Sequence, residues 1–214
     1  GYYAEDLNYA ITPSEPGSTF KLVTLMQALE DGKVTLNSSI NLEGGVWQVA
    51  GRIVKDSEKH GKFQATVLEA FEESSNVGMA KIVVNNYTNN PSAYFKHLSR
   101  LRLDSLSGID LVGERRPQIT RPGDKLWGPT TLPWMAFGYN IAIAPIQTLT
   151  LYNMVANNGV MMHPYLVNSI QEEGRIIKTN SPKAFNLQAY SPATIKAAQT
   201  ALEGVCINGT GKTL

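Results

Sequence analysis

A serine and a lysine three residues apart are the residues of this sequence best suited to covalent catalysis. They are Ser18 and Lys21, in the segment EPGSTFK at 15–21. A serine hydroxyl is a poor nucleophile until a neighbouring base takes its proton. Residues three apart on a helix share one face, and apolar surroundings lower the pKa of a lysine. The pair is therefore a candidate nucleophile and base, although Ser-x-x-Lys also occurs by chance on solvated helix faces.

The element that must position this pair is a helix predicted from about Ser18 to Glu30. Its residues are apolar on nearly every side, which is typical of a helix buried in a core. The pair Asp31-Gly32 gives its end. A lysine in the first turn of such a helix needs a special reason to be there, and the positive helix N-terminus suits a developing oxyanion.

A second group of polar residues, Ser74-Ser75-Asn76, lies just before another predicted helix that starts at Asn76. A hydroxyl and a carboxamide two residues apart on a short loop are able to face one cleft. The hydroxyl can relay a proton and the amide can donate to a substrate carbonyl. Serine and asparagine are also favoured helix N-caps, and the two interpretations are compatible.

The remaining pattern predicts helices separated by irregular segments. One helix follows Asn90-Pro91, one runs from Pro145 to the stop signal at 157–159, and one covers about 192–203. Residues 46–55 look like a strand, and 160–170 and 174–178 are candidates for a strand pair. Residues 102–135, rich in proline and glycine, are predicted to form a surface loop.

Composition excludes several classes of protein. The chain has 214 residues and a net charge of +1, which gives no electrostatic case for nucleic acid as a partner. No apolar run approaches the roughly 20 residues that span a bilayer. The single Cys206 excludes an internal disulfide framework, and the three histidines, His60, His97 and His163, have no metal-ligand spacing. We therefore predict no metal and no cofactor, with surface or structural roles for the histidines and a packing role for Cys206.

The segment EPGSTFK followed by SSNVGM, at 74–79, resembles the transpeptidase domain of class B penicillin-binding proteins, particularly the cell-division type. The segments at 138–139, 144–147, 157–159 and 209–211 fall in the family's order. The resemblance implies an α/β (α+β) fold of the serine β-lactamase and transpeptidase kind. It also implies that Ser18 is the acylated nucleophile and Lys21 its base, and that Ser74 and Asn76 form the second catalytic motif.

The same resemblance implies a D,D-transpeptidase that cross-links peptidoglycan stem peptides and is acylated by β-lactams. It implies further partners among cell-division or cell-wall synthesis proteins. Members of the family work on the outer side of the cytoplasmic membrane, held by an anchor that would lie outside this chain. No cofactor follows from the resemblance.

The family's third motif, Lys-Thr-Gly, is not found in the sequence, and Gly209-Thr210-Gly211 resembles the segment that precedes it. We therefore expect residues 1–214 to be a partial transpeptidase domain. It would contain mostly the helical part and lack the opening strands, the Lys-Thr-Gly strand and much of the central antiparallel sheet.

Three alternatives remain open. The segment STFK also occurs in class D β-lactamases, and a β-lactam sensor domain would share the same chemistry. However, 140 residues follow Ser74 without a third motif, which disfavours both. The alternative from another class is a non-catalytic binding or regulatory module on the same scaffold. The presence of all four candidate residues, Ser18, Lys21, Ser74 and Asn76, disfavours it.

Overall fold

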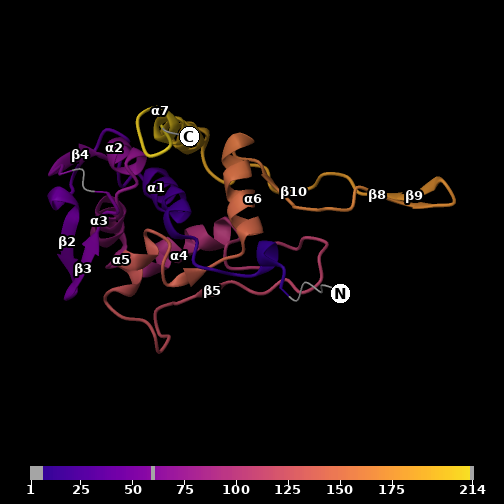
Figure 1. Ribbon diagram of the computed structural model, residues 1–214, viewed down its shortest axis with the longest axis horizontal. Helices are drawn as coiled ribbons and strands as arrows, with labels where there is room; N and C mark the ends of the chain where they lie inside the picture. Colours follow the sequence, from indigo (N-terminus) through magenta and orange to yellow (C-terminus); the bar gives the residue numbers. More distant parts are fainter. Residues whose placement is uncertain (1–6, 59–60, 213–214) are drawn as a thin grey trace, which may run out of the picture.

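The computed structural model describes residues 7–58 and 61–212 (Figure 1). Helices contain more of these residues than strands do, and the strands pair only two by two. The α-helices are α1 (Lys21–Glu30), α2 (Val67–Glu72), α3 (Asn76–Tyr87), α4 (Pro91–Arg100), α5 (Thr131–Met135), α6 (Pro145–Ala156) and α7 (Pro192–Ile207). The 3₁₀ helices are η1 (Tyr9–Ile11), η2 (Gly17–Phe20) and η3 (Glu43–Gly45). The predominance of helices agrees with the expectation from the sequence.

The strands form five antiparallel pairs, and no larger sheet joins them within the described ranges. The pairs are β1 (Ser39–Asn41) with β4 (Gln64–Thr66), β2 (Val46–Val49) with β3 (Arg52–Lys55), β5 (Gln118–Ile119) with β6 (Ile141–Ala142), β7 (Met161–Met162) with β10 (Ala184–Asn186), and β8 (Ser169–Glu172) with β9 (Arg175–Thr179). The β8–β9 hairpin projects from the helical body (Figure 1). Its pairing was predicted in part, whereas the pairing of β7 with β10 was not.

Helix α1 lies at the centre of the core, as its sequence predicts. Every residue from Lys21 to Ala28 is buried, and the helix packs against α3 and α7. The predicted start at Ser18 is correct in position but not in type, because residues 17–20 form the 3₁₀ turn η2 that leads into the α-helix. The buried helix thus fixes the segment that carries the candidate nucleophile.

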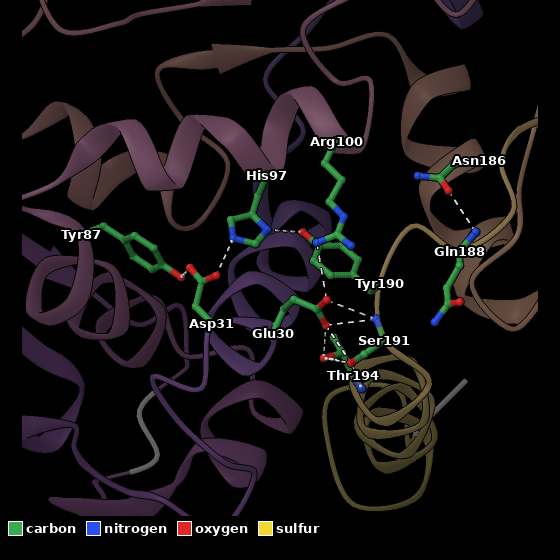
Figure 2. A network of polar contacts seen from close by, with 10 residues as sticks. All are labelled: Glu30, Asp31, Tyr87, His97, Arg100, Asn186, Gln188, Tyr190, Ser191 and Thr194. Carbon is green, nitrogen blue, oxygen red and sulfur yellow. Dashed lines mark hydrogen bonds and ion pairs between the residues drawn. The ribbon is translucent and has the colours of Figure 1, made fainter.

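A polar network fixes the C-terminal end of α1 to three other segments (Figure 2). The Asp31 carboxylate accepts a hydrogen bond of 2.9 Å from the Tyr87 hydroxyl and lies 3.1 Å from His97 Nε2. The other ring nitrogen of His97 lies 2.8 Å from the Tyr190 hydroxyl, and the two rings stack. His97, expected to be a surface or structural residue, is therefore buried and structural.

Glu30 forms the second half of this network (Figure 2). Its carboxylate accepts hydrogen bonds from the Ser191 backbone N–H at 3.1 Å, the Ser191 hydroxyl at 2.8 Å and the Thr194 hydroxyl at 2.6 Å. A carboxylate at a helix N-terminus is favourable because the helix dipole is positive there. Glu30 therefore attaches the start of α7 to the end of the helix that carries Lys21.

Two helices were not predicted. Residues 102–135, expected to be a surface loop, contain α5, whose Leu132 and Met135 are buried. Helix α2 has a capping box, in which the Thr66 side chain accepts from the Glu69 N–H and the Glu69 carboxylate accepts from Thr66. The Thr-x-x-Glu spacing was a readable signal for α2. The short α5 has no comparable signal, because burial of its apolar residues depends on the rest of the fold.

Residues 46–55 form a hairpin rather than one strand. Ala50 and Gly51 occupy its two-residue turn with φ of 49° and 74°, which is the geometry of a type I′ turn that matches the twist of the two strands. The strand pair next to the turn is Val49 with Arg52. Reversal at this turn places Arg52 and Ile53 at the tip of the hairpin.

Cys206 is exposed, so its predicted packing role is wrong. His60 lies outside the described residues, and His163 is half-buried. No group of three metal-ligating side chains occurs among the residues that the structure describes. Within the same ranges, no helix is long and apolar enough to cross a membrane.

Candidate active site

The turn that carries Ser18 is held by its backbone. The Gly17 N–H donates to the Gly138 carbonyl at 3.2 Å, and the Thr19 carbonyl accepts from the Tyr152 hydroxyl at 3.0 Å. Burial raises the pKa of Tyr152 to about 12, so the phenol stays protonated and able to donate. The side chain of Ser18 is exposed, and its hydroxyl has no hydrogen-bond partner in residues 7–58 and 61–212.

Two glycines make this turn possible. Gly17 and Gly138 have φ of 56° and 88°, and a Cβ on Gly138 would lie 2.1 Å from the Gly17 carbonyl oxygen. No side chain fits between two backbones at that separation. Gly138, in the Gly-Tyr segment that only the family resemblance singled out in the sequence, thus packs against the backbone of the turn that carries Ser18.

We expect Gly138→Ala to lower the free energy of unfolding by about 1–3 kcal/mol, because the added methyl group must displace the turn that carries Ser18. The matched control is Gly128→Ala, since a Cβ at Gly128 meets nothing within 4 Å and its φ is not positive. Urea unfolding of both variants checks this. Equal stability of the two would contradict the contact between the glycines.

Lys21 is buried with its ammonium group against Ser74. It is only 2% exposed, and its Nζ donates to the Ser74 hydroxyl at 2.9 Å and to the Ser74 carbonyl. Burial lowers the pKa of Lys21 from 10.5 to about 8, while the charge of Asp56 acts in the opposite direction. A substantial fraction of Lys21 is therefore neutral slightly above neutral pH, as a general base requires.

Ser74 reaches Lys21 through an unusual backbone conformation. Its φ is 54°, a left-handed geometry that is uncommon for residues other than glycine and that recurs at functional sites. The conformation directs both its hydroxyl and its carbonyl at Lys21 Nζ. The structure thus brings together Lys21 and Ser74, two of the four residues predicted to form the site.

The other two residues of the Ser-Ser-Asn segment have different partners. Ser75 is the N-cap of α3, because its hydroxyl accepts from the Gly78 N–H at 2.9 Å. Asn76 Nδ2 donates to the Lys55 carbonyl at 2.7 Å. The cap and the cleft functions expected of this segment therefore fall on separate serines, and the Asn76 amide is directed at strand β3 rather than at Lys21.

Asp56, which was not predicted from the sequence, lies beside this segment. Its Oδ2 accepts from the Ser75 hydroxyl and its Oδ1 from the Val77 N–H, each at 2.9 Å. These bonds place a carboxylate at the N-terminus of α3, where the helix dipole favours it. Asp56 fixes the loop that holds Ser74 and adds a negative charge near Lys21. No local signal marks it, since it lies 18 residues before Ser74.

The segment at 208–211 lies beside this loop. The Thr210 N–H donates to the Glu72 carbonyl at 3.1 Å, and a Cβ on Gly209 would lie 2.1 Å from the same oxygen. Asn208 Nδ2 donates to Glu72 Oε1 at 3.3 Å. The segment that follows α7 is therefore hydrogen-bonded to Glu72, two residues before Ser74. The start of α7 is hydrogen-bonded to Glu30 at the end of α1.

Comparison with known proteins identifies the family. The penicillin binding protein transpeptidase domain matches residues 2–214. The chain belongs to this family. Stage V sporulation protein D of Bacillus subtilis is 31% identical over 200 residues, which cover 92% of this chain and 30% of that protein. The chain thus spans about a third of the length of this relative.

Solved structures of penicillin-binding proteins are similar in fold to this chain. The D,D-transpeptidase domain of a peptidoglycan glycosyltransferase from Eggerthella lenta is similar with a TM-score of 0.84 and 25% identity, over 96% of this chain and 52% of that one. Penicillin binding protein 3 from Mycobacterium tuberculosis, complexed with aztreonam, has a TM-score of 0.78 and 26% identity, over 92% of this chain and 43% of that one. Both the family and the fold class predicted from EPGSTFK and SSNVGM are confirmed.

Proposed function

We propose that this chain supplies the serine, the base and the second motif of a D,D-transpeptidase that acts on peptidoglycan stem peptides. In the first step Lys21 takes the proton of Ser18, and Ser18 Oγ attacks the carbonyl of the penultimate D-alanine. Ser74 relays the proton to the leaving nitrogen as the bond to the terminal D-alanine breaks. Asn76 orients the donor peptide by its amide.

In the second step an amine of a neighbouring stem peptide attacks the acyl-enzyme carbonyl. The new amide bond forms, the ester bond to Ser18 breaks, and the amine proton returns to Ser18 through Lys21. β-Lactams acylate Ser18 in place of the donor peptide. The observation that carries this proposal is the buried Lys21, with its lowered pKa, bonded to Ser74 one helical turn from an exposed serine.

The test is an intact mass spectrum after incubation with benzylpenicillin, recorded for this chain and for Ser18→Ala. We expect a stable adduct of one penicillin on the chain and none on Ser18→Ala. Labelling of Ser18→Ala would overturn the assignment of the nucleophile. The matched control is Thr19→Ala, an exposed neighbour whose hydroxyl bonds only to the Pro16 carbonyl within the described ranges and which we expect to label normally.

The same spectrum separates the alternatives. A transient adduct with continued release of hydrolysed penicillin would favour a class D-type β-lactamase. No adduct would favour a non-catalytic module, or a requirement for the Lys-Thr-Gly strand that we propose lies beyond residues 1–214. Repeating the test on a longer polypeptide that carries that strand decides between those two.

We also propose the setting that the family implies. The catalytic domain would lie on the outer side of the cytoplasmic membrane, with an anchor outside this chain and with partners among cell-wall synthesis or cell-division proteins. Aztreonam in the structure of the Mycobacterium tuberculosis relative supports β-lactam recognition by this fold.

A further inference from the structure

A hollow of about 630 Å³ lies between the tip of the β2–β3 hairpin and helix α5. Its walls are formed by Gly51, Arg52 and Ile53 on one side and by Thr130, Trp134 and Asn140 on the other. Ile53 is 56% exposed, and Trp134 packs its ring against Phe137. Each side of the hollow thus combines one large apolar side chain, Ile53 or Trp134, with polar groups.

The polar side chains that line the hollow have no partners among the described residues. Within residues 7–58 and 61–212, the Arg52 guanidinium has no ion-pair, hydrogen-bond or ring partner. Within the same ranges, the Thr130 hydroxyl and the Asn140 side-chain amide have no hydrogen-bond partner. An arginine presents a planar fork of donors that matches a carboxylate, and amide and hydroxyl groups match a peptide backbone. A single cation beside the large apolar side chains of Ile53 and Trp134 fits a peptide with a carboxylate better than a polyanion.

Both sides of the hollow are connected to the candidate active site through neighbouring residues and hydrogen bonds. On one side, strand β3 continues from Arg52 to Lys55, whose carbonyl accepts from Asn76, and then to Asp56, which fixes the loop of Ser74. On the other, the Asn140 N–H donates to Glu15 at 3.0 Å, three residues before Ser18. A ligand in the hollow therefore contacts neighbours of both the nucleophile turn and the second motif.

We propose that this hollow binds the acceptor stem peptide, with a carboxylate of that peptide on Arg52 and its chain along Ile53 and Trp134. The inference rests on the proposed function, because only a transfer reaction needs a second peptide beside the acylated serine. Bound there, the acceptor is held beside the reaction and leaves the neighbourhood of Lys21 to the donor peptide and the proton transfer.

The test is the binding of a synthetic stem peptide, L-Ala–γ-D-Glu–L-Lys, with its carboxylates either free or amidated, followed by NMR titration. We expect the chain to bind the free acid about five- to tenfold more tightly than the amide, a typical effect of one exposed charge-assisted contact. Arg52→Ala should abolish this preference, and Arg52→Lys should restore part of it because the charge is kept without the planar fork.

The matched control is Arg116→Ala, since Arg116 is exposed, lies on another segment and is not part of the hollow; we expect it to behave like the unmodified chain. Circular dichroism shows whether each variant is folded. Equal binding of the acid by the unmodified chain and Arg52→Ala would overturn the inference, as would no binding of either peptide. Displacement of the acid by a neutral chito-oligosaccharide would also overturn it, in favour of a saccharide site.

The two proposals fail separately. If benzylpenicillin labels Ser18 while Arg52→Ala leaves peptide binding unchanged, only the acceptor site is wrong. If Arg52-dependent binding is found while Ser18 cannot be labelled even in a polypeptide with the Lys-Thr-Gly strand, the hollow binds a peptide carboxylate but its acceptor role is wrong along with the proposed function.

Discussion

Lys21→Ala is expected to slow the acylation of Ser18 by benzylpenicillin about 100- to 10,000-fold, the range typical of losing a general base. The physical reason is that burial lowers the pKa of Lys21 to about 8, so the unprotonated amine is accessible near neutral pH. The rate of adduct formation, followed by mass spectrometry, measures the effect in whichever polypeptide labels on Ser18. In the unmodified protein the rate should rise about tenfold per pH unit below pH 8 and then level off.

The control for this prediction is Lys33→Ala, because Lys33 is an exposed lysine just beyond the same helix. Its removal should leave both the rate and the pH profile unchanged. A near-normal rate for Lys21→Ala would mean that another group takes the proton of Ser18. A profile of the unmodified protein that shows no change near pH 8 would separate the base from Lys21 even if Lys21→Ala were slow.

The second large effect is a rise in stability with pH, caused by the same lysine. The pKa of Lys21 is about 8 in the folded protein and returns to its ordinary value near 10.5 when the chain unfolds. Between these values the unfolded chain binds more protons than the folded one, so raising the pH favours folding. The free energy of unfolding should gain about 2 kcal/mol between about pH 8 and pH 9.5.

Lys21→Met isolates this contribution, because methionine fills a similar volume without a titratable group. The difference in unfolding free energy between Lys21→Met and the unmodified chain, measured by urea unfolding, should be largest at about pH 7 and shrink as the pH rises. Burial raises the pKa values of Tyr87, Tyr94 and Tyr190 and opposes the rise at still higher pH, but these tyrosines affect both proteins equally. A difference that does not vary with pH would contradict the lowered pKa of Lys21.

Burial of Lys21 is expected to have opposite effects on activity and on stability. The burial that lowers the pKa of Lys21 to about 8 would suit it to act as a base at moderate pH, and the same burial destabilises the fold at neutral pH. Lys21→Met should therefore be more stable and inactive. Such a trade is expected where a group is held in an environment that suits catalysis rather than packing.

Local sequence determined the segments that depend on nearest neighbours. The buried helix at 21–30, the start of α3 after Ser75 and the limits of α6 at Pro145 and 156–159 all follow from apolar periodicity, capping residues and left-handed stop positions. These signals act within one or two turns of chain. The family followed from two short motifs, and so did the identity of the four candidate residues.

Tertiary structure alone decided how those residues meet. The contact of Lys21 with Ser74 joins residues that are 53 apart in the sequence. The carboxylate that hydrogen-bonds the loop of Ser74 belongs to Asp56, in a segment with no motif. Helix α5 and the hollow beside Arg52 depend on burial against segments far away in sequence. Local propensity carries no information about such contacts, because their free energy arises only when the remote partner is already in place.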